Sequence, residues 1–437
     1  MVIIRKPFYR IAHWVCPVLI PVFLGSALLQ EPRGITLHPP SEPIPAVFFG
    51  LHIHHAADST PWPPFSVSAW RLWDSEVAWR HLQPKPHEWN FTLLDKYVDL
   101  AERHHTEILL TLGYLPRWAA SRPDEASSPG GLGAASNPAD IEAWREYVRK
   151  VATRYRNRIH VYEIWNEANL PGYYSGTISQ MMALAREAYS ILKEVDGNNL
   201  VVSPSAMGGS SNLRWLDDFL AQGGGEYCDI IGYHFYVTPG PPEAMLNLIA
   251  QVKQILDRRH VYKRVWDTET GWASGKQFAD DDERMGYLAR SYILAWASGI
   301  DRLYWYAYDN YNWSTLPLTL PDGRTLNAAG TALENLQSWL VNVRLQSCSH
   351  NARGLWTCEI IEQNRMPGLI LWSTSQETVP ATLSLRFKNP HLHHLNGRTD
   401  SWNGHSDLNV GPSPILIDDN VGKVYIADET RKAGRDS

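Results

Sequence analysis

Eight short apolar segments recur between residues 46 and 345, and amphipathic stretches separate most of them. Each apolar segment has the length and composition of a buried β-strand, and the stretches between them have the 3.6-residue period of helices. The strand candidates span residues 46–54, 66–73, 107–112, 160–165, 200–204, 229–235, 264–268 and 302–307. The helix candidates span residues 93–104, 138–156, 179–194, 213–221, 242–259, 281–297 and 331–342. This alternation predicts the α/β class and a (β/α)8 TIM barrel.

An open, doubly wound parallel sheet is the alternative arrangement of the same elements. No glycine-rich phosphate loop follows any of the strand candidates, and this favours the barrel. Asn137 directly precedes Pro138, which predicts that a helix begins at this proline with Asn137 as its N-cap.

The pattern changes after residue 345, where short alternating runs are broken by Asn, Gly, Pro and His. These runs predict an antiparallel β-sandwich domain over residues 346–428. Its strand candidates span residues 354–361, 368–373, 381–387, 415–417 and 423–427. The other expected parts of the chain are a signal peptide at 1–27, a Pro-rich linker at 28–45, the barrel at 46–345 and a disordered tail at 429–437.

The N-terminus has the pattern of a targeting segment. Arg5, Lys6 and Arg10 precede an apolar run over residues 11–29, in which the small residues 25–27 form a cleavage site. This predicts a secreted or periplasmic protein. An uncleaved membrane anchor is the alternative, because the run approaches the length that spans a bilayer.

Composition narrows the partners. The formal net charge is −6 and the Lys and Arg residues are scattered, so no nucleic-acid partner is predicted. The chain has 19 Trp and 20 Tyr, and aromatic rings in loops can stack on the apolar faces of sugars. Cys348 and Cys358 lie in the strand-rich region and could close a hairpin disulfide, while Cys228 is expected to be a small buried apolar residue.

Two glutamates follow strand candidates at the edge where barrel enzymes hold their chemistry. Asn166 and Glu167 follow the fourth strand, and Glu269 ends the seventh. Two carboxylates at such positions can act as a proton donor and a nucleophile on a glycosidic bond. Local capping or ion pairing is the alternative role for each glutamate taken alone.

Other polar and aromatic residues follow neighbouring strands. Arg71 lies in the second strand, where a guanidinium could keep a carboxylate ionised. His234 and Tyr236 share one face after the sixth strand, and Tyr236 could donate to the nucleophile. Trp305 in the eighth strand could form the floor for a bound sugar. A structural histidine and a tryptophan that plugs the barrel are the alternatives for His234 and Trp305.

Together these residues resemble the pattern of clan A glycoside hydrolases, and the barrel is most similar to glycoside hydrolase family 39. The resemblance covers residues 46–342 and rests on Arg71, Asn166, Glu167, His234, Tyr236, Glu269 and Trp305, with further similarity at 112–118, 165–174 and 320–326. It implies that Glu167 is the acid/base, Glu269 the nucleophile and Asn166 the donor to the sugar 2-hydroxyl. It also implies an appended β-sandwich. Ala168 departs from the pattern, because many relatives have Pro there.

Two other functions compete with this one. His52 and His54 form a His-x-His after the first strand, which a metal-dependent amidohydrolase would complete with His234 and Asp309. The fifth strand, however, has no His, and that site leaves Arg71 and Glu269 without roles. A carbohydrate-binding barrel without catalysis is the other alternative.

The sequence therefore predicts a retaining glycoside hydrolase that acts on a polysaccharide or oligosaccharide and needs no cofactor or metal. His54 is expected to line the sugar pocket. The candidates for subsite walls are Trp62, Trp118, Tyr173, Tyr174, Trp272 and Trp313. The sugar, the linkage, exo or endo action and the oligomeric state stay open at this point.

Overall fold

The computed structural model describes residues 34–419 except 129, 210, 274, 363–365, 374, 376–378, 382–386 and 403–406. The predicted signal peptide, the last predicted strand at 423–427 and the predicted tail lie outside the described residues. None of the helices within the described part of the chain is long and apolar enough to cross a membrane.

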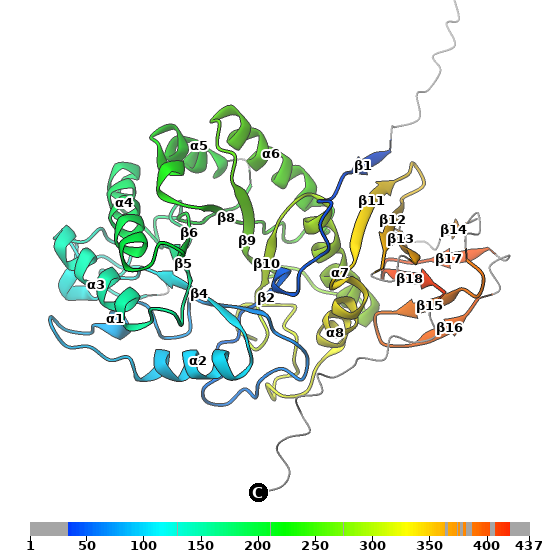
Figure 1. Cartoon of the computed structure of the whole chain (residues 1–437), viewed down its shortest axis with the longest axis horizontal. Coiled ribbons are helices and arrows are strands. Elements are labelled where there is room, and N and C mark those ends of the chain that lie inside the picture. Colours follow the sequence, from blue (N-terminus) through cyan, green and yellow to red (C-terminus); the bar gives the residue numbers. More distant parts are fainter. Residues whose placement is uncertain are drawn as a thin grey trace, which may run out of the picture. The chain divides into compact units, whose positions relative to one another are not determined.

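A closed barrel of parallel strands forms the larger part of the structure (Figure 1). Its strands follow the order β6-β5-β4-β3-β2-β10-β9-β8, and a pairing between β6 and β8 closes the ring. They span β2 Phe49–Leu51, β3 Ala69–Leu72, β4 Glu107–Leu112, β5 Val161–Ile164, β6 Leu200–Val202, β8 Ile230–His234, β9 Arg264–Thr270 and β10 Arg302–Trp305, with the two-residue β7 Ala206–Met207 beside β8. The predicted barrel is confirmed. Its first strand is shorter than expected, because Ala46–Phe48 forms a 3-10 turn.

Helices lie outside the strands (Figure 1). They span α1 Trp79–Leu82, α2 Thr92–Arg103, α3 Ile141–Arg154, α4 Ile178–Val195, α5 Leu213–Ala221, α6 Ala244–Arg258, α7 Asp281–Ala297 and α8 Ala328–Leu340. The predicted start of α3 was wrong. Asp140 is its N-cap and accepts the Glu142 amide at 2.9 Å, whereas the Asn137 side chain accepts the Tyr174 hydroxyl.

The barrel interior changes from apolar to polar along the strands. One buried layer is apolar and takes one residue from each of seven strands: Ala69, Leu109, Val161, Val202, Ile230, Trp266 and Tyr304. Side chains two residues further along a strand point to the same side, and in β3, β4 and β5 these are Arg71, Thr111 and Glu163. The carboxyl ends of the strands are therefore the polar end of the barrel.

Antiparallel strands form the C-terminal region. Seven of them make one sheet in the order β1-β11-β12-β13-β18-β15-β16, and β14 pairs with β17 in a second. They span β1 Ile35–Leu37, β11 Arg344–His350, β12 Leu355–Ile361, β13 Pro367–Ser373, β14 Val379–Ala381, β15 His391–His394, β16 Thr399–Ser401, β17 Leu408–Val410 and β18 Ile415–Asp418. The sequence had placed β1 in the linker, but β1 pairs with β11.

The hairpin disulfide that the sequence left open is present. Cys348 and Cys358 face each other across β11 and β12 and are bonded, while Cys228 is a free, buried cysteine. The sheet contacts the barrel helices. The Trp372 indole donates to Glu243 Oε1 at 3.0 Å, and a side chain at Gly286 of α7 would begin 2.6 Å from the Pro412 carbonyl oxygen.

Candidate active site

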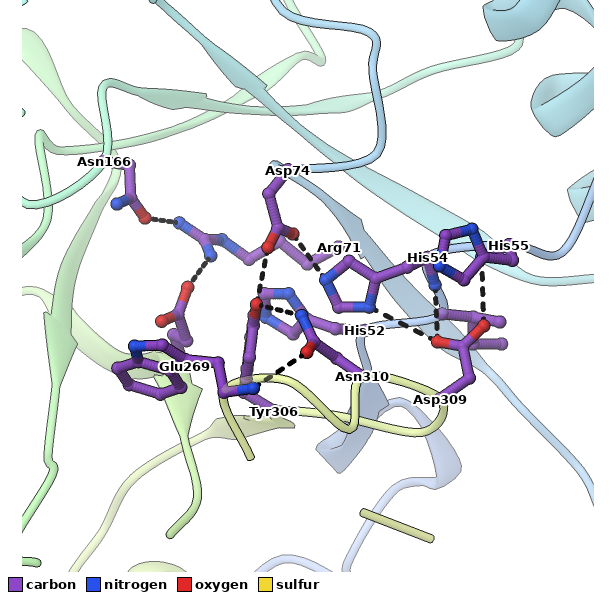
Figure 2. A network of polar contacts seen from close by, with 12 residues as sticks. His52, His54, His55, Arg71, Asp74, Asn166, Glu269, Tyr306, Asp309 and Asn310 are labelled. Carbon is purple, nitrogen blue, oxygen red and sulfur yellow. Dashed lines mark hydrogen bonds and ion pairs between the residues drawn. The ribbon is translucent and has the colours of Figure 1, made fainter. Parts of the chain in front are cut away.

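Arg71 lies at the centre of a buried polar cluster at the carboxyl ends of the strands. Its Nε donates to Glu163 Oε2, its Nη1 to Glu269 Oε2 and its Nη2 to Asn166 Oδ1, each at 2.7 Å. The side chain is fully buried. Burial lowers the pKa of Arg71, but Glu163 and Glu269 raise it further, so the guanidinium stays charged. It therefore fixes Glu269 and Asn166 in one place (Figure 2).

Glu269 reaches this cluster through an irregularity in β9. The register between β9 and β10 shifts by one residue between Leu303 and Trp305. A bulge of this kind interrupts the alternation of sides, so Thr268 and Glu269 can both face the site. The Tyr236 hydroxyl donates to Glu269 Oε1 at 3.0 Å. Each oxygen of this carboxylate thus accepts a hydrogen bond.

Glu167 is presented by a strained turn after β5. Glu167 has φ +48° and Trp165 has φ +70°, which is a left-handed conformation that non-glycine residues seldom adopt. Backbone hydrogen bonds hold the turn: Trp165 donates to Leu112, and Ala168 donates to Ser205 at 3.0 Å. Strain held in this way is typical of functional sites.

His234 lies beside the two glutamates and contacts Glu167. Its Nδ1 lies 3.0 Å from Glu167 Oε1. One carboxylate oxygen of Glu167, one of Glu269 and a ring nitrogen of His234 all lie within 4.8 Å of one another. Burial lowers the pKa of His234 to about 4, so this imidazole is neutral near pH 7. The predicted pair of carboxylates is therefore close enough for both groups to act on the same bond of a substrate.

The two glutamates differ in their partners. Burial raises the pKa of Glu167 to about 7; Arg71 opposes this rise, and Glu163 and Asp74 add to it. Burial also raises the pKa of Glu269, while His234 and Arg71 oppose this rise. Only Glu269 has a guanidinium and a phenol bonded directly to its carboxylate. We therefore expect the proton of the pair to reside on Glu167.

A second cluster lies beside the first, around His54 (Figure 2). His54 Nε2 forms an ion pair with Asp74 Oδ1 at 2.6 Å, and its Nδ1 lies 3.3 Å from Asp309 Oδ1. Tyr306 donates to Asp74 Oδ2 at 2.5 Å and accepts from Asn310 at 2.8 Å. Strands β2, β3 and β10 are neighbours in the barrel, which is why the loops after them meet.

Three predicted binding residues do not reach this site. Trp305 and Trp272 are buried and pack against each other at 5.9 Å, because successive residues of a strand point to opposite sides and Trp305 points outward. The Trp118 indole donates to the Gln83 carbonyl and contacts Trp79. The prediction that Trp305 forms a sugar floor is therefore corrected. Tyr306, one residue later, points into the site.

The remaining loop aromatics divide into two groups. Trp62 stacks on His104 and Tyr174 packs on Trp165, so both belong to the packing around the barrel. Trp313 is 42% exposed and lies edge-on to Tyr236 at 5.6 Å and to Tyr306 at 5.3 Å. Burial raises the pKa of Tyr173, and the charges of Glu167 and Glu269 add to this rise. Trp313 contacts Tyr236, whose hydroxyl binds Glu269.

The residues of the metal-site alternative are only partly together. Ligand atoms of His52, His54 and Asp74 lie within 4.8 Å of one another. Both ring nitrogens of His54 already face carboxylates, so neither offers a free lone pair while the ring is protonated. His234, which that site also requires, contacts Glu167 instead. The arrangement fits a metal site poorly.

Sequence reasoning missed two acidic residues and Tyr306. Glu163 is buried in β5 and accepts from Arg71, from Thr111 at 2.6 Å and from Ser205. Its signal was a carboxylate at an inward position of an apolar strand. Asp74 directly follows the strand candidate 66–73 and Tyr306 lies near the end of the candidate 302–307, so their positions at the carboxyl ends of the strands were the available signal.

Residues 139–339 match the model of the family described as glycosyl hydrolase catalytic core. This protein is a glycosidase. The resemblance to glycoside hydrolases that the sequence predicted is thus confirmed for residues 139–339. A search of curated proteins gave no match.

The fold of the glycosidase is shared with many solved structures. A family 39 glycoside hydrolase from Bacteroides cellulosilyticus WH2 has a TM-score of 0.69 at 19% identity, over 87% of this chain and 81% of that one. A monomeric β-xylosidase from Caulobacter crescentus CB15 has a TM-score of 0.61 at 13% identity, over 87% and 97%. An α-L-arabinofuranosidase from Thermotoga maritima has a TM-score of 0.61 at 13% identity, over 88% of this chain and 99% of that one. At these identities the likeness concerns the fold alone.

Proposed function

We propose that the protein is a retaining glycoside hydrolase in which Glu269 is the nucleophile and Glu167 the acid/base. The observation that carries the proposal is the spacing of at most 4.8 Å between oxygens of the two carboxylates. Retaining enzymes hold their carboxyl groups about 5–5.5 Å apart, whereas inverting enzymes need about 6.5–9.5 Å to admit a water molecule.

The reaction proceeds in two displacements. Glu269 Oε attacks the anomeric carbon, the bond to the leaving oxygen breaks, and Glu167 gives its proton to that oxygen. Glu167 then takes a proton from water, the water oxygen attacks the anomeric carbon, and the bond to Glu269 breaks. Two inversions at one carbon restore the starting configuration.

The surroundings support this division of roles. Arg71 and Tyr236 bind the two oxygens of Glu269 and stabilise its anion. Glu167 has a pKa raised to about 7, which suits a group that first gives and then takes a proton near neutral pH. Asn166 is oriented by Arg71 and could donate its amide hydrogen to the sugar 2-hydroxyl.

Trapping of the intermediate tests the assignment. A 2-deoxy-2-fluoro glycoside with an activated leaving group should label wild-type protein covalently, and peptide mass analysis should find the label on Glu269. Glu269→Gln should lower kcat by about a thousandfold or more. Proton NMR of the first product should show the configuration of the substrate. An inverted product would exclude the mechanism.

Glu167→Gln tests the acid. It should slow substrates with a poor leaving group much more than 2,4-dinitrophenyl glycosides, because an activated phenol leaves without a proton donor. Glu146→Gln on the exposed face of α3 removes the same charge away from the site and should leave both rates unchanged. Equal slowing of both substrates would contradict the role of Glu167.

We also propose that the enzyme is exported and acts on polysaccharide or oligosaccharide outside the cytoplasm. The basic and apolar pattern of residues 1–27 supports this. Expression with and without this segment, followed by fractionation, tests it. Equal recovery from the cytoplasm in both cases would contradict export.

A further inference from the structure

Asp74 stands between the two clusters of the site, and the proposed reaction gives it no role. Its side chain is 22% exposed, whereas that of Asp309 on the other side of His54 is 1% exposed. Within the Asp74 carboxylate, Oδ1 is buried against His54. The charge of Asp74 acts on both Glu167 and Glu269 and raises the pKa of each. Figure 2 shows Asp74 between the Arg71 group and the His54 group. It is the accessible end of the His54 cluster, beside the reacting pair.

The cluster holds Asp74 ionised and oriented. Asp309 accepts the backbone N–H groups of His54 and His55 at 2.8 and 3.0 Å, so its two oxygens anchor the loop after β2. Burial lowers the pKa of His54, but Asp74 and Asp309 outweigh burial and raise it to about 10. The imidazolium therefore presents one N–H to each carboxylate. Burial raises the pKa of Asp74, and His54 reverses this to a value well below the ordinary one.

Neighbouring groups leave Asp74 as an acceptor for a ligand. The Tyr306 hydroxyl donates its hydrogen to Asp74 and accepts a hydrogen bond from Asn310, so it has no hydrogen to donate to a ligand. Asp74 Oδ1 is buried beside His54, so Oδ2 is the oxygen left for a ligand. Oδ2 accepts from Tyr306, and a carboxylate oxygen can accept two hydrogen bonds. A sugar in contact with the glutamate pair would bring hydroxyl groups to this carboxylate.

The charges of the site disfavour an acidic sugar. Arg71 and His54 are each bonded to two carboxylates, and burial lowers the pKa of His52 and His234, so both of these are neutral near pH 7. Five carboxyl groups thus face two cations among the described residues of the two clusters. A ligand carboxylate would find repulsion and no unpaired cation there.

We propose that Asp74 determines the specificity of the site, by accepting through Oδ2 a hydrogen bond from a hydroxyl of an uncharged sugar ring and by repelling sugars that carry a carboxylate. This rests on the proposed function, because it places the sugar that reacts with Glu269 beside Asp74. His54 and Asp309 are positioning residues for it.

A matched pair of substrates tests the proposal. Wild-type enzyme is assayed on the 4-nitrophenyl β-D-xyloside, β-D-glucoside, β-D-galactoside, β-D-mannoside, β-D-glucuronide and α-L-arabinofuranoside. The glucoside and the glucuronide differ only by a hydroxymethyl or a carboxylate at C5. The best neutral glycoside should exceed the glucuronide in kcat/KM by about a hundredfold or more. A glucuronide preference, or turnover of none of the neutral sugars, would overturn the proposal.

Asp74→Asn should lower kcat/KM on the best neutral glycoside by about tenfold to 150-fold, because a bond to a charged acceptor is lost. The loss should be small on the monodeoxy analogue that lacks the bound hydroxyl, and the preference over the glucuronide should narrow by about tenfold. Equal losses on all substrates would show that Asp74 is structural. If Asp74→Asn fails to fold, Asp74→Glu replaces it in the test because it keeps the charge. Its loss of kcat/KM should also be large on the best neutral glycoside and small on the monodeoxy analogue.

Glu76→Gln is the control, since Glu76 is exposed on the same loop and its substitution removes the same charge. It should leave the selectivity unchanged. The covalent label separates the two proposals. A label on Glu269 in wild-type enzyme with equal losses in Asp74→Asn overturns only the role of Asp74. An unlabelled Glu269 in an enzyme that still turns over overturns the nucleophile assignment.

Discussion

The Arg71 and His54 clusters have the same plan with different cations. In each, a cation lies between an inner, buried carboxylate and an outer, more exposed one. For Arg71 the inner carboxylate is Glu163 and the outer one is Glu269. For His54 the inner carboxylate is Asp309 and the outer one is Asp74. The outer carboxylates have side-chain exposures of 7% and 22%, and the inner ones 0% and 1%. A guanidinium cannot lose its proton in this pH range, whereas an imidazolium can. The Arg71 cluster therefore keeps its cation over this pH range, whereas the His54 cluster keeps its cation only while the imidazole is protonated.

The largest expected effect on stability follows the removal of the Arg71 guanidinium. Arg71→Met should lower the free energy of unfolding by about 3–5 kcal/mol, because it leaves two buried carboxylates without their partner. Arg71→Lys keeps the charge but loses the planar fork, so we expect a smaller loss of stability. Denaturant unfolding measures both. If Arg71→Met were as stable as the wild type, Glu163 and Glu269 would not depend on the guanidinium.

Removal of the inner carboxylates compares the clusters directly. Glu163→Gln should cost about 3–5 kcal/mol of unfolding free energy, since Arg71 stays charged with one carboxylate left. Asp309→Asn should cost about 1–3 kcal/mol, since His54 can lose its proton when its partner is neutral. Unfolding at pH 7 measures the difference. A larger cost for Asp309→Asn would reverse the comparison.

Alkaline pH should weaken only the His54 cluster. The folded pKa of His54 is raised to about 10 from an ordinary value of 6.5, so its contribution is full below about pH 6.5 and is lost as pH rises toward 10. The stability difference between wild type and His54→Gln should therefore shrink between pH 6.5 and 10.5. The titratable side chains facing His54 are Asp74, Asp309, His52, His55 and Tyr306. A difference that stays constant over this range would contradict the charge assigned to His54.

The smallest expected effect couples the two clusters. Activity should fall above about pH 7, because Glu167 must hold its proton and its pKa is raised to about 7. The charge of Asp74 contributes to this rise, so Asp74→Asn should move the alkaline limb of kcat/KM to lower pH by less than about one unit. Glu76→Gln should not move it. A shift to higher pH would contradict the electrostatic coupling.

Much of the barrel could be predicted because its signal is local. Each strand is an apolar run, and the position of Glu167 just after such a run already placed it at the catalytic edge. The prediction failed where alternation along one strand had to be read without its neighbours. Trp305 points outward, while the shifted register of β9 turns Glu269 toward the site. The outward direction of Trp305 and the bulge in β9 could not be found from a single strand, although the position of Glu269 at a strand end could.

The sequence by itself determined the eight strands of the barrel, most of the helices between them and the pair of glutamates at strand ends. Periodicity and residue type are properties of the chain, so they can be read without a structure. Only the tertiary structure decided which cation serves which carboxylate. Arg71 bonds to Glu163 and Glu269 over 92 and 198 residues of sequence, and His54 bonds to Asp309 over 255. Barrel closure brings these groups together, and their charge states then depend on burial and on partners that no local pattern encodes.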